Sequence, residues 1–311
     1  MTGLVAFGVL IVAAVAFLYG APERATRVLL DLERRRSGLK RKQITLPNSL
    51  HYAFLEGGKG EPLMLLHGFG GGKDNFTRAA RYLEPLYRVI IPDHIGFGES
   101  AHPLEADYSP IAQAERLRAL AHALGISRLH LGGNSMGGQV AMTYAALYPD
   151  EVRSLWLLDS AGVWRGPESD LHRIEEKTGR NPLLAKNEQE FAGLLSLVMK
   201  DPPFIPRPVL KVMARERIKN FPLEQRIAEQ VRADSVEERV KGLDIPALIV
   251  WGGEDRVIDV AAAEVLHRLL PRSQVIILPG VGHLPMVERP RQTVQDYLRF
   301  RAGIAPCSGT T

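Results

Sequence analysis

Short apolar runs alternate with longer amphipathic segments along most of this chain. The short runs predict strands, because they are too short for helices and are rich in Val, Ile and Leu. They comprise residues 62–66, 89–92, 129–131, 154–158, 247–251 and 274–278, with helices expected at 76–86, 111–124, 137–147 and 291–301. Such alternation predicts an α/β fold with a mostly parallel central sheet flanked by helices. Two earlier runs, 44–46 and 50–55, predict an antiparallel pair at the start of the sheet.

The alternation stops after the sixth of these strands, at Asp159, and resumes at Ile245. The interval contains predicted helices at 188–199, 208–219 and 223–231, separated by proline-rich joints. We therefore divide the chain into a core, an inserted helical segment and a tail. The core comprises 43–162 and 241–302, the helical cap 163–240 and the tail 303–311.

The N-terminus is predicted to cross a membrane. Residues 3–21 contain no charged side chain, and at about 1.5 Å per residue they span roughly 28 Å, close to the thickness of a bilayer core. A cleaved signal peptide is the alternative, but no Lys or Arg precedes the run, and the run exceeds the usual apolar part of such peptides. We favour an uncleaved transmembrane anchor at residues 1–21.

A basic segment, residues 22–42, follows the anchor and is predicted to form a juxtamembrane helix. From Glu23 to Lys42 there are eight Lys or Arg and three acidic residues, a net charge of +5, whereas the whole chain carries +4. Nucleic acid is not the expected partner, because its sites spread basic side chains over a folded face with aromatics between them. Anionic lipid headgroups fit better, at about 1 kcal/mol per basic residue near the surface.

One face of this basic segment is apolar, with Ala25, Val28, Leu29 and Leu32 at helical spacing. The stripe can pack on the core, lie on the membrane or join a second copy, and the sequence leaves these alternatives open. Small residues at Ala16 and Gly20 allow two anchors to approach closely. A homodimer through the anchor and the juxtamembrane helix is therefore a further hypothesis.

The amino-acid composition limits the kinds of core and site that the chain can form. A chain of 311 residues with 45% hydrophobic content can bury one large α/β core and an insertion. Its single cysteine, Cys307, excludes internal disulfides and cysteine-rich metal sites. No cluster of His, Cys and Asp has zinc-like spacing in the sequence. We therefore expect neither a metal nor another cofactor.

Residues 130–138 carry the most informative chemistry. They contain Gly133-x-Ser135-x-Gly137 between a predicted strand and a predicted helix, the context of a nucleophile elbow. Such a turn holds its serine at positive φ, where side chains two residues away would clash, so both flanking positions need glycine. The helix N-terminus behind the serine favours developing negative charge. We predict that Ser135 is a nucleophile.

A base and an acid for this serine follow the last two predicted strands. Asp255 lies in the turn after one strand, and His283 lies in a glycine-flanked loop after the other. We expect His283 to take the proton of Ser135, and Asp255 to orient the imidazole and stabilise its charged form. Two other acids compete for the second role. Glu254 is expected to face solvent, whereas Asp159, at the end of a strand, is the serious alternative.

A glycine-rich stretch, His67-Gly68-Phe69-Gly70-Gly71-Gly72, follows residues 62–66. Such a bend lets backbone N–H groups point into a cavity with no side chains in the way. We expect an oxyanion hole here, with His67 supporting the loop and not acting as a second base. Phosphate binding is the alternative for a glycine-rich loop, but neither the dinucleotide nor the Walker spacing is present.

Together these strings resemble the α/β-hydrolase family, and within it the family V bacterial lipase and monoacylglycerol-lipase-like group. They are His67-Gly68-Phe69-Gly70-Gly71, Gly133-Asn134-Ser135-Met136-Gly137-Gly138, Trp251-Gly252-x-x-Asp255, Gly282-His283-x-Pro285-Met286-Val287-Glu288 and the structural turn Asp93-x-x-Gly96-x-Gly98-x-Ser100. The resemblance covers roughly residues 43–302. It implies the order Ser135, Asp255, His283, an oxyanion hole made by the N–H groups of Phe69 and Met136, and a helical cap after the sixth strand.

With its anchor, the chain is most similar to the PlaF-type membrane-bound phospholipases A. The resemblance implies a serine carboxylic ester hydrolase that releases fatty acids from phospholipids, lysophospholipids or monoacylglycerols through an acyl-enzyme. A general short-chain esterase, a C–C bond hydrolase of ring-cleavage products and a non-catalytic acyl-binding protein are the alternatives.

The expected location is the bacterial cytoplasmic membrane, crossed once. The basic flank favours a cytoplasmic core by the positive-inside rule. The resemblance, and an insertion route that keeps the initiating amine in the cytoplasm, favour a periplasmic core. We expect the periplasmic orientation.

Overall fold

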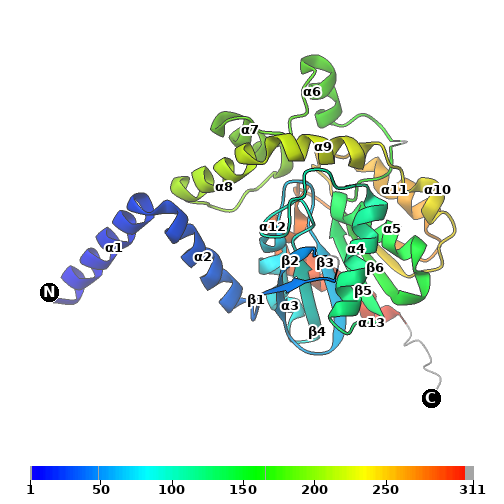
Figure 1. The fold of residues 1–311 in the computed structure, drawn as a ribbon, viewed down its shortest axis with the longest axis horizontal. Coiled ribbons are helices and arrows are strands. Elements are labelled where there is room, and N and C mark those ends of the chain that lie inside the picture. The colour runs from blue at the N-terminus through cyan, green and yellow to red at the C-terminus, as the bar shows by residue number, and fades with distance from the viewer. Residues whose placement is uncertain (1, 48, 165, 305–311) are drawn as a thin grey trace.

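The computed structural model describes residues 2–47, 49–164 and 166–304 (Figure 1). Its strands form one sheet in the order β1-β2-β4-β3-β5-β6-β7-β8. Strands β3 to β8 are parallel, whereas β2 is antiparallel to both of its neighbours. The bounds are β1 Lys40–Thr45, β2 His51–Gly57, β3 Glu61–Leu66, β4 Tyr87–Pro92, β5 Leu129–Asn134, β6 Val152–Leu158, β7 Ala247–Gly252 and β8 Ser273–Leu278.

Helices cover both faces of this sheet. One apolar layer includes residues of α4 (Pro110–Ala123), α5 (Met136–Leu147) and α11 (Ala261–Leu269), and the other includes residues of α3 (Thr77–Leu83) and α13 (Pro290–Gly303). Each strand supplies both layers by alternation, as β3 does with Met64 and Leu66 in the first and Leu63 and Leu65 in the second. Strands buried on both faces are typical of parallel sheets. The predicted α/β fold with a mostly parallel, helix-flanked sheet is confirmed.

The predicted juxtamembrane helix at 22–42 is wrong in its last part. Helix α2 spans Pro22–Arg36, and the chain then turns into β1 at Lys40. The turn passes through Gly38 at a φ of 68°, and the N–H of Leu39 donates to the carbonyl of Arg34. Glycine takes up this left-handed conformation without a steric penalty, so the helix ends here. The last basic residues of the segment therefore belong to an edge strand, where charge discourages unwanted strand pairing.

Between β6 and β7 the chain forms a helical layer that lies across one end of the sheet in Figure 1. Its helices are α6 (Asp170–Thr178), α7 (Glu188–Val198), α8 (Arg207–Lys219), α9 (Phe221–Arg232) and α10 (Glu237–Val240). Helices α7, α8 and α9 match the predicted runs closely, whereas the shorter α6 and α10 are additional. Much of the apolar content of this cap is buried within it, around Leu194, Leu197 and Phe191.

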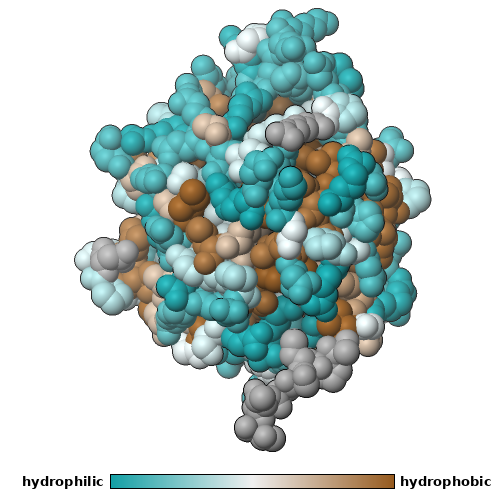
Figure 2. Space-filling model, turned by 90° about the vertical axis from the view of Figure 1, so that its right-hand side faces the viewer, coloured by the Kyte–Doolittle hydropathy of each residue, from teal (hydrophilic) through white to brown (hydrophobic). Residues whose placement is uncertain are grey.

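Helix α1 (Thr2–Gly20) points away from the rest of the molecule in Figure 1. Most of its described apolar side chains are exposed, among them Phe7 at 64%, Val12 at 69% and Tyr19 at 64%. Over the described part of the chain, no helix is both long and apolar enough to cross a membrane. Figure 2 shows the side opposite α1, where hydrophilic residues cover most of the surface and apolar residues form separate patches. Beyond α13, most of the predicted tail, including Cys307, lies outside the described residues.

Candidate active site

Ser135 occupies the sharp turn between β5 and α5. Its φ is 53° and its ψ is −121°, and its carbonyl accepts the N–H groups of Gly138, Gln139 and Ala161. A non-glycine residue in this conformation is strained, and the strain persists only where the surrounding structure enforces it. The positive φ predicted for Ser135 is confirmed. The residue is 8% exposed, so its hydroxyl lies in a nearly closed site at a helix N-terminus.

The glycines around Ser135 are required by contacts with backbone. A Cβ atom on Gly133 would lie 2.2 Å from the carbonyl oxygen of Gly137, and one on Gly137 would lie 2.2 Å from the carbonyl oxygen of Leu66. These separations are far below van der Waals contact in a close-packed interior. The expected clash of flanking side chains is therefore confirmed, and it arises from the backbone of β3 as well as from the turn itself.

His283 and Asp255 form a hydrogen bond of 2.8 Å between Nδ1 and Oδ2. Their side chains are 4% and 0% exposed. The other carboxylate oxygen of Asp255 accepts the N–H groups of Val257 at 2.7 Å and Ile258 at 3.1 Å. The carboxylate is therefore held on both oxygens, and it orients the imidazole with Nδ1 as donor and Nε2 as the available base.

Asn134, the neighbour of Ser135, connects the serine turn to the histidine loop. Its Nδ2 donates to the carbonyl of His283 at 2.9 Å and to the carbonyl of Leu158 at 3.1 Å. The N–H of His283 donates to the carbonyl of Val198 in α7 at 3.0 Å. The backbone of the histidine is thus held by the elbow on one side and by the cap on the other.

Asp159, the competing acid, lies beside this pair. It follows β6 with a φ of 44° and is fully buried, and one of its oxygens accepts the N–H of Gly252 at 2.8 Å. Burial raises the pKa of Asp159 well above its usual range, and the nearby charge of Asp255 raises it further. The hydrogen bond from His283 goes to Asp255, which favours Asp255 as the acid. Glu254 is exposed, as expected.

The glycine-rich loop after β3 lies against the serine. A Cβ atom on Gly68 would lie 3.1 Å from the Cβ of Ser135. The N–H of Gly71 donates to the carbonyl of Gly68, which closes a turn around Phe69 and Gly70. The N–H of Phe69 takes no part in that closing hydrogen bond. Met136 begins α5, so its N–H has no acceptor within the helix. The two expected oxyanion donors, Phe69 and Met136, therefore belong to segments that meet at the serine.

His67 holds this loop in place. Its Nδ1 donates to the carbonyl of Gly68 at 2.8 Å, and its Nε2 accepts the N–H of His94 at 3.0 Å. Both ring nitrogens are occupied by these hydrogen bonds. Burial lowers the pKa of His67, which favours the neutral ring. These contacts agree with the expectation that His67 supports the loop and is not a second base.

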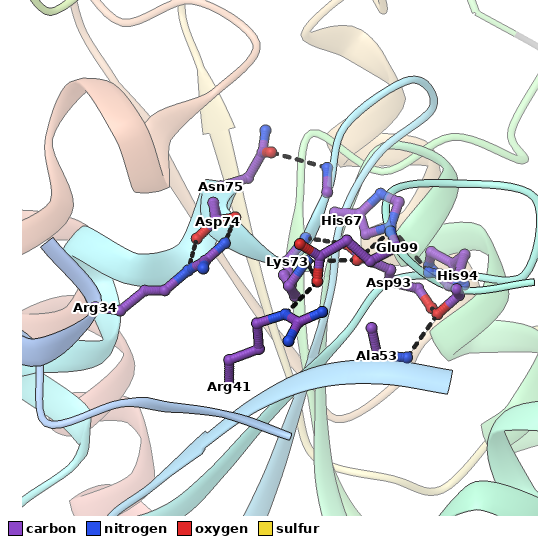
Figure 3. A network of polar contacts seen from close by, with 12 residues as sticks. Arg34, Arg41, Ala53, His67, Lys73, Asp74, Asn75, Asp93, His94 and Glu99 are labelled. Carbon is purple, nitrogen blue, oxygen red and sulfur yellow. Dashed lines mark hydrogen bonds and ion pairs between the residues drawn. The ribbon is translucent and has the colours of Figure 1, made fainter. Parts of the chain in front are cut away.

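A buried ion pair secures the far end of the loop (Figure 3). Lys73 Nζ lies 2.7 Å from Asp93 Oδ2, and the two side chains are 3% and 1% exposed. Asp93 also accepts the backbone N–H groups of Lys73 and Glu99. A Cβ on Gly98 would lie 2.3 Å from Asp93 Cγ, which explains the glycine. Buried charges whose partners are all present hold a structure rigidly.

Two neighbouring helices contact this loop and the 3₁₀ turn Lys73–Phe76 that follows it. From α2, Arg34 donates to both carboxylate oxygens of Asp74, at 2.7 and 2.6 Å (Figure 3). From the cap helix α8, Arg217 donates to the carbonyl of Gly70 at 2.9 Å, and its guanidinium lies 5.7 Å from the ring centroid of Phe69. Arg217 is itself oriented by Glu224 at 2.8 Å. The glycine-rich loop is therefore held by the cap, and the 3₁₀ turn after it is held by α2.

An apolar groove of about 470 Å³ adjoins the site. It lies between α2, the cap and the 3₁₀ turn Lys73–Phe76, and its lining includes Leu29, Leu32, Met199, Leu284 and Val287. Leu284 directly follows His283 in the chain, and the 3₁₀ turn directly follows the glycine-rich loop. Two residues of the apolar stripe predicted on α2 therefore line this groove.

Among the described residues, two groups bring three possible metal ligands within 4.8 Å of one another. One is Asp159, Asp255 and His283, where Nδ1 of the histidine is already hydrogen-bonded to Asp255. The other is Glu168, His172 and Glu176, which are exposed at α6. The expectation of no metal stays a prediction.

The roles of Asn134, Arg217 and Arg34 are not apparent from the sequence. Asn134 stands inside the serine motif, so its position next to the nucleophile is the one available signal. Arg217 and Arg34 lie on amphipathic helices among many other basic residues, and their contacts depend on how those helices are placed on the core.

Comparison with known proteins shows which proteins this chain resembles. A family model described as the alpha/beta hydrolase fold matches residues 61–290. Lipase 1 of Psychrobacter immobilis is 46% identical over 286 residues, 89% of each chain. Monoacylglycerol lipase ABHD6 of Rattus norvegicus is 27% identical over 97% of this chain and 94% of its own. A solved membrane phospholipase A, described as a bacterial virulence factor, matches with a TM-score of 0.88 and 38% identity over 97% of this chain and 98% of its own.

Proposed function

Because this chain belongs to the alpha/beta hydrolase fold family, we propose that it is a membrane-anchored serine hydrolase of lipid esters. Its substrates are phospholipids, lysophospholipids or monoacylglycerols, from which it releases fatty acids. Membership of the family confirms the resemblance read from the motifs, and the lipase, monoacylglycerol lipase and phospholipase A relatives support a carboxylic ester hydrolase. The observation that carries the mechanism is the hydrogen bond between His283 and Asp255 beside a strained serine turn.

In this mechanism Ser135 Oγ attacks the carbonyl carbon of the ester while Nε2 of His283 takes the hydroxyl proton. The carbonyl oxygen becomes an oxyanion, which accepts hydrogen bonds from the N–H groups of Phe69 and Met136. The tetrahedral intermediate then collapses, and the imidazolium gives its proton to the leaving alcohol. Water activated by His283 attacks the acyl-enzyme, which releases the fatty acid and restores Ser135.

The apolar groove supports a long acyl chain as part of the substrate. Its lining by Leu29, Leu32, Met199, Leu284 and Val287 offers contacts to methylene groups beside the histidine loop. Each buried CH₂ contributes about 0.8 kcal/mol, so a chain of several methylenes gains substantially over a short one. A long-chain preference is therefore part of the proposal.

Anchoring in a membrane is supported by the composition and exposure of α1. Its 19 residues carry no charged side chain, and many of its described apolar side chains are exposed. The similar phospholipase A is described as a membrane protein. We propose a single-pass bacterial cytoplasmic membrane protein with a periplasmic core, and a homodimer joined through α1 and α2. Protease protection of the core in spheroplasts with intact membranes would contradict the periplasmic orientation.

The decisive experiment measures fatty-acid release by the detergent-purified protein. The substrates are diacyl phospholipids, lysophospholipids, monoacylglycerols and short-chain p-nitrophenyl esters. We expect release from the lipid substrates, and a loss of about 10³-fold or more in kcat for Ser135→Ala. Ser196→Ala, which changes an exposed serine of α7, serves as the matched control and is expected to keep the parent rate.

Each other result has a definite meaning. Hydrolysis of short esters alone would identify a general esterase and refute lipid hydrolysis. Undiminished activity of Ser135→Ala would refute the serine mechanism. Turnover of a ring-cleavage dienone with no ester hydrolysis would favour the C–C bond hydrolase. Inertness toward every substrate, with no labelling of Ser135 by a fluorophosphonate, would favour an acyl-binding protein.

A further inference from the structure

Asp159 is a buried carboxyl group that the mechanism above does not use. One of its oxygens accepts the N–H of Gly252 at 2.8 Å, whereas its Oδ2 is buried without any hydrogen-bond donor among the described residues. A buried polar atom without a partner loses its hydration and gains nothing in exchange. Protonation of this oxygen would remove the problem, because the hydroxyl could then donate to a neighbouring acceptor.

The acceptor beside it is the carboxylate of Asp255. One oxygen of Asp159, one oxygen of Asp255 and one ring nitrogen of His283 all lie within 4.8 Å of one another. The charge of Glu288, in α12 (Pro285–Glu288), also acts on Asp159. The oxygens of Glu288 accept the backbone N–H groups of Gly282, Lys200 and Asp201. Buried carboxyl groups this close do not both ionise, because each negative charge opposes the other.

The proton belongs on Asp159 and not on Asp255. Asp255 accepts hydrogen bonds from the N–H groups of Val257 and Ile258 and from His283. Asp159 accepts one, from Gly252. Hydrogen-bond donors stabilise a carboxylate, so the better supplied group carries the charge. Burial and the nearby charge of Asp255 both raise the pKa of Asp159.

We propose that Asp159 is a positioning residue that stays protonated and donates from Oδ2 to the carboxylate of Asp255. The donated hydrogen bond fixes the orientation of Asp255 and draws part of its negative charge toward Asp159. A weaker negative charge therefore acts on His283. This role rests on the proposed function only in taking His283 as the base. The protonation of Asp159 itself is independent of any activity.

The first test compares Asp159→Asn with Asp159→Leu, because Asp, Asn and Leu share one branched shape. The amide of asparagine reproduces the protonated acid, since it donates from nitrogen and accepts from oxygen. We expect Asp159→Asn to keep kcat/KM within about threefold of the parent. Asp159→Leu leaves Asp255 without its donor, so that the full negative charge of Asp255 acts on His283. We expect the acid limb of its kcat/KM profile to move by about half a pH unit or more to higher pH.

Asp255→Asn is the reference for losing the acid, with an expected fall of about 10³- to 10⁴-fold in kcat. An equally large fall in Asp159→Asn would overturn the proposal, because Asp159 would then act as an ionised acid. Identical pH profiles for Asp159→Asn and Asp159→Leu would overturn it too, because the donated hydrogen bond would then have no effect on His283.

The second test needs no activity and decides the protonation state alone. Above about pH 4 the unfolded chain releases the Asp159 proton, whereas the folded protein keeps it up to the raised pKa. The folded state then holds more protons than the unfolded state, so its stability falls as pH rises. Asparagine carries no such proton. We expect the difference in Tm between Asp159→Asn and the parent to grow in favour of the variant from pH 4 upward, and a difference independent of pH would overturn the proposal.

Discussion

At the residue scale, Gly137 shows how little room the serine turn leaves. A Cβ there would meet the carbonyl oxygen of Leu66 at 2.2 Å, and that carbonyl belongs to a central strand that cannot shift alone. Gly193, in contrast, lies on the exposed side of α7 with nothing within 4 Å of its Cβ position. The two glycines therefore form a matched pair for substitution by alanine.

We expect Gly137→Ala to lower the free energy of unfolding by about 3 kcal/mol or more, because backbone overlap forces the elbow and β3 apart. We expect Gly193→Ala to raise it by up to about 1 kcal/mol, because alanine is the better helix former. Urea unfolding of both variants measures these changes. A Gly137→Ala protein as stable as the parent would show that the turn adapts, and would remove the reason given for the glycine.

The residues proposed for chemistry were predictable where the chemistry is written in one short string. Ser135 with its flanking glycines needed no knowledge of distant contacts, and neither did His283 in its glycine-flanked loop after a predicted strand. The choice between Asp255 and Asp159 did need it, because both acids end neighbouring strands and meet beside the same imidazole. The hydrogen bond to His283 distinguishes them, and no local pattern encodes it.

At the element scale, the cap helix α8 supports the glycine-rich loop through Arg217. Its guanidinium reaches the carbonyl of Gly70, the carbonyl of Leu183 and the carboxylate of Glu224 at once. Burial raises the pKa of Glu224, while the charge of Arg217 opposes that shift. A lysine could keep the charge but not the planar fork that serves three acceptors. The position of Phe69 therefore depends on an arginine at this site.

We expect Arg217→Lys to lower kcat about tenfold while KM changes by less than about threefold, because the loss falls on stabilisation of the oxyanion. Arg215→Lys is the control, since Arg215 lies on the same helix in an exposed pair with Glu23. Steady-state kinetics on one ester substrate compares them. A change confined to KM would mean that Arg217 serves substrate binding and not the loop.

Elements were predictable from the sequence where their apolar pattern is strong, as in the buried parallel strands and in α7, α8 and α9. The end of α2 was missed because its basic residues continue into β1, and the break depends on one glycine, Gly38, in a left-handed conformation. Helix α6 was missed because it is short and mostly polar, with Leu171 as its buried residue. Its other support comes from an N-cap at Ser169 and from contacts with the core.

At the scale of the whole molecule, the proposed site in the core does not depend on α1. The proposed site uses residues from the glycine-rich loop onward, and α2 is attached to the core by Arg34 with Asp74. A chain lacking residues 1–20 should therefore keep its site. We expect it to hydrolyse a soluble short-chain ester within about threefold of the parent rate. We also expect it to lose binding to vesicles of zwitterionic phosphatidylcholine, which do not attract the basic residues of α2. Sedimentation with vesicles and a p-nitrophenyl assay measure the two effects.

Continued binding of the shortened chain to vesicles would refute the proposed anchor, and loss of soluble-ester hydrolysis would show that α1 supports the site.

Crosslinking in membranes tests the proposed homodimer. We expect the yield of crosslinked dimer to fall when residues 1–38 are removed. An unchanged yield would refute dimerisation through these helices.

The long excursion between β6 and β7 has a consequence for the time at which the protein becomes active. Ser135 and the glycine-rich loop leave the ribosome first, whereas Asp255 and His283 follow only after the whole cap has been made. At roughly 5–20 residues per second, the serine waits on the order of ten seconds for its base. During that interval the proposed anchor is already made, while the proposed nucleophile has no base to deprotonate it. Because the proposed base follows the last strand, β8, we expect hydrolysis of lipid esters to begin only after that strand has been made.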